Sequence, residues 1–364
     1  MKEKALEILK IFEEHGYIAY IVGGYVRDTL IGKKTLDIDI CTNATPKEII
    51  KIFDQVQVSD FSYGSVCILY KNVKFDVTTF RKDIKYEDNR KPVKIKYIGN
   101  LKDDLLRRDF TINTLCINSN GEVLDLLDAR CDLENKLIKT VSNPKMKIKQ
   151  DSLRILRAVR FATILDFDIE LKTKKAIIKY GSLLKKLSGS RKKEELTKIL
   201  SSVNKEKGRS LLIELKLDKY LDLHNLKDIK LCNDIIGIWA QLDVTDIYPF
   251  TKLELENISK IKELLNYKEI DEYTLYQYGL YLSSVVYDIK GKDKVILNEM
   301  YRNLPIYNSK EIDITPLEIS MILNMQPGSY LKYIISDLEK QIVYGNIENK
   351  KEIISKYILD KNVL

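Results

Sequence analysis

The stretch "YIVGGYVRDTLIGKKTLDIDICTNATP", residues 20–46, decides the fold of the first half of the chain. An apolar run leads into Gly23 and Gly24, and about ten residues later Asp37 and Asp39 stand one residue apart in a second apolar run. Side chains at positions i and i+2 of a strand point to the same face. A strand through "LDIDI" therefore predicts two carboxylates side by side.

Leu36 and Ile40 flank this acidic pair, and we expect them to anchor the opposite face of the strand. Two like charges in a half-buried place raise each other's pKa unless a cation lies between them. Asp76 in "KFDVTTF" would add a third acid from the polar face of another strand. Oxygen ligands without histidine favour magnesium. The alternative, for the bare pair and for Asp76 alone, is a solvent-exposed strand with an acidic face.

The glycine pair ends the first strand, and a short helix begins near Val26. Backbone N–H groups at Gly24 and at the start of such a helix can receive a phosphate, and Arg27 would add a bidentate donor. Most glycine pairs are simply tight turns. The position of this turn, just ahead of the paired acids, favours a phosphate-binding role.

The composition excludes several classes of function. With two histidines and five scattered cysteines in 364 residues, the chain offers little for zinc hydrolysis, a Ser-His-Asp triad or a disulfide framework. The start of the chain is charged, and no apolar stretch approaches about 18 residues. We expect a cytoplasmic protein with no membrane association and no obligate protein partner. The net charge of +8 permits a polyanionic partner.

The order of sequence patterns predicts an α/β head followed by helices. Residues 1–140 alternate strands with helices, as in a small mixed sheet, and include a Thr45 capping box and a hairpin turn at Lys71-Asn72. From residue 141 onward the pattern is helical. We expect an all-α neck over 141–205 and a helical body and tail over 206–364.

Four motifs occur in order between about residues 17 and 165: "IVGGYVRDTLIG…LDIDICTNATP", "VTTFR", "LLRRDFTINTL" and "QDSLRILRAVRFA". Together they resemble the class II CCA-adding enzyme and poly(A) polymerase family, whose nucleotidyltransferases extend RNA 3′ ends without a template. The resemblance implies a palm-like head, a helical neck, and a body and tail that hold tRNA. It makes Asp37 and Asp39 the metal-binding acids and Arg108 a nucleotide ligand, with Asp109 orienting its neighbours.

The segment "DSLRILRAVR" predicts a helix with an apolar side and a charged side that carries Asp151, Arg154, Arg157 and Arg160. Such charges usually form salt bridges on a solvent-exposed helix face, which is the alternative to a role in nucleotide binding. A carboxylate and a guanidinium can instead accept from the exocyclic amine and donate to the ring nitrogen that cytosine and adenine share. The resemblance gives Asp151 and Arg154 this role and places the other two arginines nearer the phosphates. Gln150 departs from the family's usual Glu.

Two further segments bear on RNA. The charged segment 82–104 resembles the flexible loop of the family, with an ordinary hairpin as the alternative. Residues 172–193 contain basic and no acidic residues, which suits RNA phosphates, although any single lysine is as consistent with a solvated helical face. Ser188, Arg191 and Glu195 also resemble the family's last neck motif.

These observations predict a Mg²⁺-dependent enzyme that adds C, C and A to the tRNA 3′ end from CTP and ATP. An A-adding enzyme or a poly(A) polymerase shares every quoted motif and stays open. A non-catalytic RNA-binding protein on the same scaffold is the remote alternative, since such a protein would be expected to lose the acids or Arg27.

Overall fold

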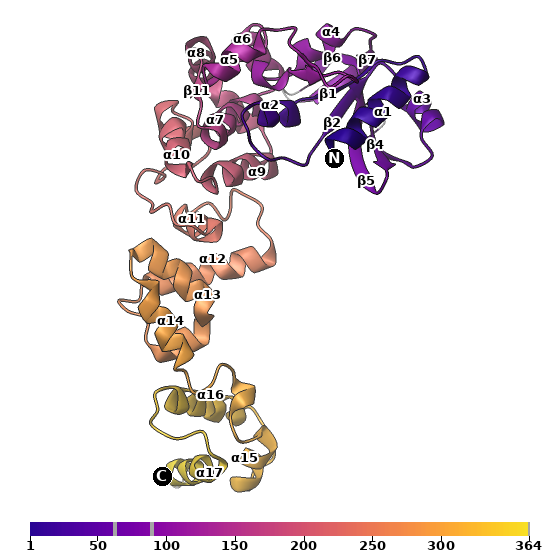
Figure 1. The fold of residues 1–364 in the computed structure, drawn as a ribbon. Coiled ribbons are helices and arrows are strands. Elements are labelled where there is room, and N and C mark those ends of the chain that lie inside the picture. Colours follow the sequence, from indigo (N-terminus) through magenta and orange to yellow (C-terminus); the bar gives the residue numbers. More distant parts are fainter. Residues whose placement is uncertain (61–63, 88–90, 363–364) are drawn as a thin grey trace. The chain divides into compact units, whose positions relative to one another are not determined.

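The computed structural model describes residues 1–60, 64–87 and 91–362. The chain forms two compact units, one of residues 1–227 with 246–249, and one of residues 228–245 with 250–364. Figure 1 traces the elements along the chain, from the sheet of the head to the helices that follow it. In the part of the chain that the structure describes, no helix combines the length and apolarity that a membrane crossing requires.

The head is built on a seven-stranded sheet in the order β3-β4-β5-β2-β1-β8-β9. Its strands are β1 (Ala19–Val22), β2 (Asp39–Thr42), β3 (Val56–Asp60), β4 (Ser65–Tyr70), β5 (Val73–Thr79), β8 (Cys116–Ile117) and β9 (Val123–Leu124). The β2–β5 pair is parallel, and the other neighbours are antiparallel. The expected mixed sheet is confirmed.

The helices of the head are α1 (Lys2–Glu14), α2 (Gly24–Leu30), α3 (Pro46–Ile52), α4 (Leu101–Arg107) and α5 (Ala129–Glu134), with the 3₁₀ turn η2 (Thr111–Asn113). Thr45 and Glu48 form the predicted capping box at the start of α3. Lys71 and Asn72 have φ values of 47° and 63°, which matches the tight turn predicted between β4 and β5.

The strand predicted through "LDIDI" is shorter than expected. Strand β2 begins at Asp39, so Asp37 and Leu36 precede it, and Leu36 is 72% exposed instead of anchoring a buried face. The register gives the reason: Asp39 lies opposite Val22, the last residue of β1, so the residues before Asp39 have no β1 partner.

The segment that resembles a flexible loop contains two paired strands. Strand β6 (Arg81–Glu87) pairs antiparallel with β7 (Lys91–Tyr97), and α4 follows them. Residues 88–90 of this segment lie outside the described residues. The described part therefore fits the hairpin alternative.

The neck consists mainly of helices. Its elements are α6 (Pro144–Gln150), α7 (Leu153–Leu165), α8 (Leu171–Tyr180), η3 (Gly181–Lys186) and α9 (Gly189–Leu200). Helix α10 (Lys205–Glu214) and η4 (Asp218–Tyr220) follow within the same compact unit. The all-helical prediction missed one short strand, β11 (Asp168–Ile169), which pairs in parallel with β10 (Leu137–Ile138). Two residues are too few to show a period of two in the sequence.

Helices α7 and α9 of the neck pack together with α10. A Cβ on Gly208 of α10 would lie 2.5 Å from Cγ2 of Ile199 and 2.9 Å from Oγ1 of Thr163. The missing side chain at Gly208 therefore allows the three helices to approach closely.

The second unit is helical in its described residues. It contains α11 (Ile235–Gln241), α12 (Lys252–Leu265), α13 (Glu272–Lys290), α14 (Lys294–Arg302), η5 (Ser309–Glu311), α15 (Pro316–Ile322), α16 (Tyr330–Val343) and α17 (Lys351–Asn362). Gly279 has a φ of 76° and kinks α13. Trp239 is buried and meets Phe250 edge to face, with the ring centroids 5.6 Å apart.

Candidate active site

Gly23 lies beside two side chains of the predicted site, the carboxylate of Asp39 and the guanidinium of Arg108. Its φ is +84°, so β1 turns sharply into α2. A Cβ at this position would lie 3.6 Å from Nη1 of Arg108 and 3.6 Å from Oδ2 of Asp39. Glycine therefore suits this position because it adopts the left-handed backbone conformation. The two distances are those of ordinary van der Waals contact, so the turn lies directly beside the carboxylate and the guanidinium.

Asp39 and Asp76 lie opposite each other on the parallel strands β2 and β5. Asp76 is exposed while Phe75 and Val77 are buried, as the alternating pattern predicted. Although the Asp39 side chain is partly open to solvent, loss of surrounding water raises its pKa; Arg108 opposes this shift, and Asp76 and Asp37 add to it. The carboxylates of Asp39 and Asp76 therefore repel each other electrostatically.

The three acids do not form a complete metal cage. Among the described residues, no group of three His, Cys, Asp or Glu side chains is placed to hold a metal ion. Mg²⁺ does not require such a cage, because it commonly uses one or two protein carboxylates, together with waters and substrate phosphates. The Asp39–Asp76 pair, with Asp37 just before β2, fits that mode of binding.

The Arg27 side chain of α2 is held by two hydrogen bonds. It is nearly buried, its Nε donates to Oδ1 of Asp28 at 2.8 Å, and its Nη1 donates to Oδ1 of Asn113 at 2.7 Å. A Cβ on Gly24 would lie 3.7 Å from Nη2 of Arg27. The two residues predicted to meet phosphate are therefore neighbours in space.

Asp104 supports Arg108 and was missed by sequence reasoning. The Asp104 carboxylate is fully buried; Nε of Arg107 donates to its Oδ1 at 2.8 Å, and Nη2 of Arg108 lies 3.4 Å from its Oδ2. Burial alone would lower the pKa of Arg108, but Asp104, with smaller contributions from Cys41, Cys116 and Asp39, outweighs that effect and raises it. The i,i+3 and i,i+4 spacing of these charges was the available signal.

A chain of polar contacts joins the head to the neck. Arg157 of α7 donates from Nε to Oδ2 of Asp109 at 2.7 Å, and its Nη2 lies 2.6 Å from the same oxygen. Asn113 donates to Oδ1 of Asp109 at 3.1 Å and accepts from Arg27. The orienting role expected of Asp109 is consistent with these contacts, whereas Asn113 was not singled out in the sequence.

Arg154 is 7% exposed, which rules out the solvated-face alternative for this residue. Its Nη1 donates to the carbonyl oxygen of Lys147 at 2.9 Å and to Oε1 of Gln150 at 3.3 Å, and its Nη2 donates to the carbonyl oxygen of Arg107 at 3.1 Å. The neutral amide of Gln150 is therefore sufficient to accept a hydrogen bond from Arg154.

Asp151 lies just before α7 and not on the helix as predicted, because it ends α6 and its Oδ1 accepts from the N–H of Leu153. Burial raises the pKa of Asp151, and the nearby Arg154 opposes that shift. Arg160 pairs with Glu195 of α9 at 3.1 Å. Burial likewise raises the pKa of Glu195, opposed by Arg160.

Comparison with known proteins identifies the family of this chain. Residues 19–139 match the model of the Poly A polymerase head domain, and residues 166–225 match that of a probable RNA and SrmB-binding site of polymerase A. A CCA-adding enzyme of Ligilactobacillus salivarius is 34% identical, over 99% of this chain and 98% of its own length. This chain belongs to the CCA-adding enzyme family.

Further CCA-adding enzymes support the assignment. That of Enterococcus faecalis is 32% identical over 98% of this chain and 95% of its own. The crystal structure of the Bacillus stearothermophilus CCA-adding enzyme in complex with CTP is 26% identical, with a TM-score of 0.89 over 99% of this chain and 97% of that one. A Thermotoga maritima CCA-adding enzyme complexed with tRNA, 20% identical, covers 99% of this chain and 94% of that one with a TM-score of 0.71, which shows the shared fold.

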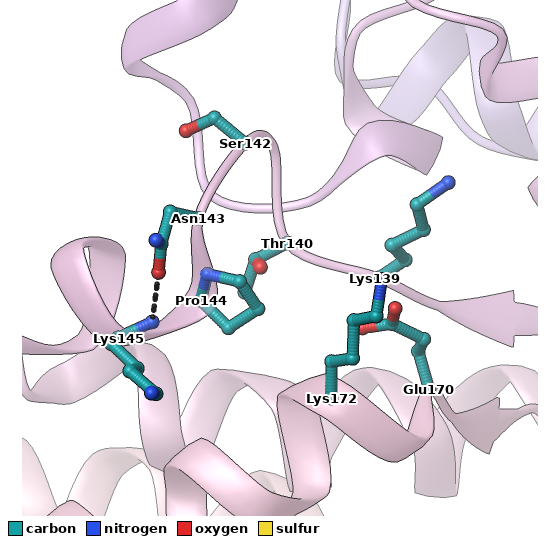
Figure 2. A pocket seen from close by; sticks show the side chains of 8 residues that line it. All are labelled: Lys139, Thr140, Ser142, Asn143, Pro144, Lys145, Glu170 and Lys172. Carbon is teal, nitrogen blue, oxygen red and sulfur yellow. Dashed lines mark hydrogen bonds between the residues drawn. The ribbon is translucent and has the colours of Figure 1, made fainter.

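This member of the CCA-adding enzyme family also has a pocket that none of the predicted site residues lines. Its volume is about 470 Å³, and Figure 2 shows its lining: Lys139, Thr140, Ser142, Asn143, Pro144, Lys145, Glu170 and Lys172. The Asn143 side chain accepts from the backbone N–H of Lys145 at 3.0 Å. The lining lysines give this pocket a positive charge. Glu170 offsets part of that charge, and so does Asp132, which pairs with Lys139 at 3.3 Å.

The basic run 172–193 spans α8, η3 and the start of α9. Its lysines differ in their surroundings: Lys174 pairs with Glu214 at 3.0 Å, and Lys192 is 7% exposed beside the ring of Tyr248. Lys172 and Lys175, by contrast, are exposed. Only part of the run is therefore open to a polyanion.

Proposed function

We propose that this protein adds C, C and A in turn to the 3′ end of tRNA, taking CTP and ATP as substrates and releasing pyrophosphate, without a nucleic-acid template. The observation that carries this proposal is that one compact unit holds an acid-and-arginine site in the head and an Asp151–Arg154 pair in the neck. The CCA-adding relatives match over nearly the whole chain.

The selection of C and A is assigned to Asp151 and Arg154. A carboxylate that accepts from an exocyclic amine, beside a guanidinium that donates to a ring nitrogen, accommodates cytosine and adenine and leaves uracil and guanine mismatched. The contacts of Arg154 with three protein acceptors hold its guanidinium in a defined orientation. The B. stearothermophilus relative, which was solved with CTP, supports CTP as a substrate.

The metal is assigned to Mg²⁺ held by Asp37 and Asp39, with Asp76 as the neighbouring acid. The donor set consists of oxygen ligands, and Asp39 lies opposite Asp76 on adjacent strands. Burial raises the pKa of Asp39, and the nearby Asp76 and Asp37 add to that shift. When bound, a divalent cation would supply charge neutralisation at the triphosphate and a lower pKa for the attacking hydroxyl.

The protein's own groups contribute positioning and charge. Arg27, Arg108, Arg157 and Arg160 are placed to bind the triphosphate and to stabilise the negative charge that develops as the RNA 3′-hydroxyl attacks the α-phosphorus in line. Pyrophosphate leaves as the new phosphodiester forms. No protein nucleophile is needed, because the rate gain comes from orientation and electrostatic stabilisation.

Binding of the RNA is assigned in part to the exposed lysines of the run 172–193. An acceptor stem is A-form RNA, which proteins recognise through its shape and backbone, so phosphate contacts are the expected mode. The five cysteines, all within the described residues, form no disulfide, which is consistent with a reducing cytoplasmic location.

The test supplies the purified protein with three tRNAs that end before CCA, after C and after CC, with CTP and ATP singly and together. Completion of CCA followed by a stop supports the proposal. Addition of A only to the third tRNA would indicate an A-adding enzyme, and long A tails a poly(A) polymerase. Binding of tRNA without incorporation would favour the non-catalytic alternative.

A further inference from the structure

Phe161 of α7 is surrounded by three arginines. The guanidinium carbons of Arg27, Arg157 and Arg160 lie 5.2, 5.3 and 4.6 Å from the centre of its ring. All three distances are within the range of a cation–π contact. One aromatic side chain therefore contacts an arginine of the head and two arginines of the neck.

Each of these guanidiniums also has a carboxylate partner. Asp28 pairs with Arg27 at 2.8 Å, Asp109 with Arg157 at 2.6 Å, and Glu195 with Arg160 at 3.1 Å. A guanidinium has five N–H donors, so these pairings leave donors available on each group. The carboxylates fix one edge of each arginine, and the Phe161 ring lies close to all three.

The ring itself is held in place by the head. Phe110, which is fully buried and follows Asp109 directly, meets Phe161 with ring centroids 5.7 Å apart and planes at 80°. This edge-to-face geometry is a favoured arrangement for aromatic pairs. The orientation of Phe161 is thus tied to the segment that carries the Asp109 contact with Arg157.

We propose that Phe161 is a positioning residue that holds Arg27, Arg157 and Arg160 together as one cationic surface for the triphosphate of the incoming nucleotide. Three guanidiniums this close repel one another, and the electron-rich ring faces reduce that repulsion without occupying their N–H donors. The inference rests on the proposed function and extends it to a residue that touches no substrate.

The role makes a specific prediction about substrates. Because CTP and ATP carry the same triphosphate, loss of the ring affects both equally and leaves the choice of base unchanged. The effect also depends on the number of phosphates, so CTP binding weakens more than CMP binding. A defect in base reading, as expected for Arg154, would show the opposite pattern.

The experiment compares the wild-type protein with Phe161→Leu, which keeps much of the volume but removes the ring, and Phe161→Tyr, which keeps the ring. Phe167→Leu is the matched control, since Phe167 is a buried aromatic of the same neck that contacts none of the three arginines in the described contacts. The measurements are KM and kcat for CTP and ATP, equilibrium dialysis with labelled CTP and CMP, and the thermal unfolding midpoint.

We expect Phe161→Leu to raise KM for CTP and ATP by about 5- to 30-fold, in line with two or three lost cation–π contacts. Affinity for CTP should fall by a similar factor, affinity for CMP by less, and Phe161→Tyr should stay within about threefold of wild type. Phe167→Leu should lower the unfolding midpoint without changing KM.

Three results would overturn the inference. The first is a KM of Phe161→Leu within twofold of wild type, the second is a loss in Phe161→Tyr as large as in Phe161→Leu, and the third is an equal loss in Phe167→Leu. The dialysis arm needs no turnover, so it tests the role of Phe161 even where the tRNA assay fails. Failure of wild-type CCA addition with normal CTP binding would count against the proposed function alone.

Discussion

Asp109 and Arg157 form the closest ion pair between the head motif "RRDF" and the neck helix α7, with Nη2 of Arg157 2.6 Å from Oδ2 of Asp109. Burial alone would raise the pKa of Asp109, but Arg157 and the hydrogen bond from Asn113 hold it well below its ordinary value. The pair therefore joins two parts of the site and makes stability depend on the charge of one carboxyl group.

Asp109→Asn should destabilise the first unit by about 2–4 kcal/mol at pH 7, because it leaves Arg157 without its carboxylate. A depressed pKa means that the stabilisation is present above the unfolded pKa, near 3.9, and is lost as the pH falls below it. Urea unfolding at several pH values should show a constant difference from wild type between pH 5 and 8 that shrinks below about pH 4. A difference that grows on acidification would contradict the assignment.

The buried Lys147 side chain should make the free energy of unfolding depend on pH in the alkaline range. Burial, with a contribution from Arg154, lowers the pKa of Lys147 to about 7. The unfolded chain then binds more protons than the folded one between about pH 7 and 10.5, so the stability that this group contributes rises with pH over that window. The cost of burying the charge is fully present below pH 7.

Lys147→Met should remove this dependence. The stability of wild type relative to the variant should increase by about 2–4 kcal/mol from pH 7 to pH 10, measured by the midpoint of urea unfolding. Lys145→Met, on the same helix, is the control that should leave the slope unchanged. Equal slopes for wild type and Lys147→Met would show that the Lys147 pKa is not displaced.

Asp39→Asn should reduce nucleotide incorporation by at least about 100-fold, because it removes a charged ligand at the place where the triphosphate reacts. Binding of tRNA, followed by gel shift, should be retained. Wild-type incorporation by Asp39→Asn in Mg²⁺ would exclude the proposed metal ligand.

Arg154→Ala should lower the ratio of kcat/KM for CTP over UTP by about 100-fold, because the donor that distinguishes the pairing edges is lost. The measurement is single-nucleotide addition to a tRNA that ends before CCA. An unchanged ratio with a uniformly lower rate would assign Arg154 a structural role instead.

Gly23→Ala separates backbone strain from disruption of the site. Gly23 and Gly32 both have positive φ values, +84° and +72°, but only Gly23 has Asp39 and Arg108 beside it, whereas nothing lies within 4 Å of a Cβ on Gly32. Each substitution should cost roughly 1 kcal/mol of stability from backbone strain. Because backbone strain at Gly23 would shift the turn beside Asp39 and Arg108, only Gly23→Ala should also lower kcat/KM, by about tenfold or more. Equal activity of the two variants would show that the backbone at Gly23 does not position these two side chains.

Much of this arrangement could be predicted from the sequence. Local signals were sufficient for the Thr45 capping box, the turn at Lys71-Asn72 and the helices of the neck, because each depends on residues a few positions apart. Leu36 was predicted wrongly, since the start of β2 is set by where β1 ends and not by the alternation of its own residues.

The site was predictable only in part, for the same physical reason. Asp39 and Arg108 belong to recognisable motifs, whereas their shared proximity to Gly23 is visible only in the structure. The contacts of Asn113 and Phe161 depend on how α7 packs against the head, and no pattern within one segment encodes a contact between residues about 50 to 130 positions apart.

The parallel pairing of β2 with β5 has a consequence for synthesis of the chain. Two parallel neighbours cannot be joined by a tight turn, so the chain between β2 and β5 must be synthesised before Asp39 and Asp76 can meet. The arginines of α7 leave the ribosome some eighty residues later still. During synthesis the residues of the acidic pair therefore emerge before the helix that we propose holds the nucleotide, so the proposed site cannot be complete until the neck has emerged.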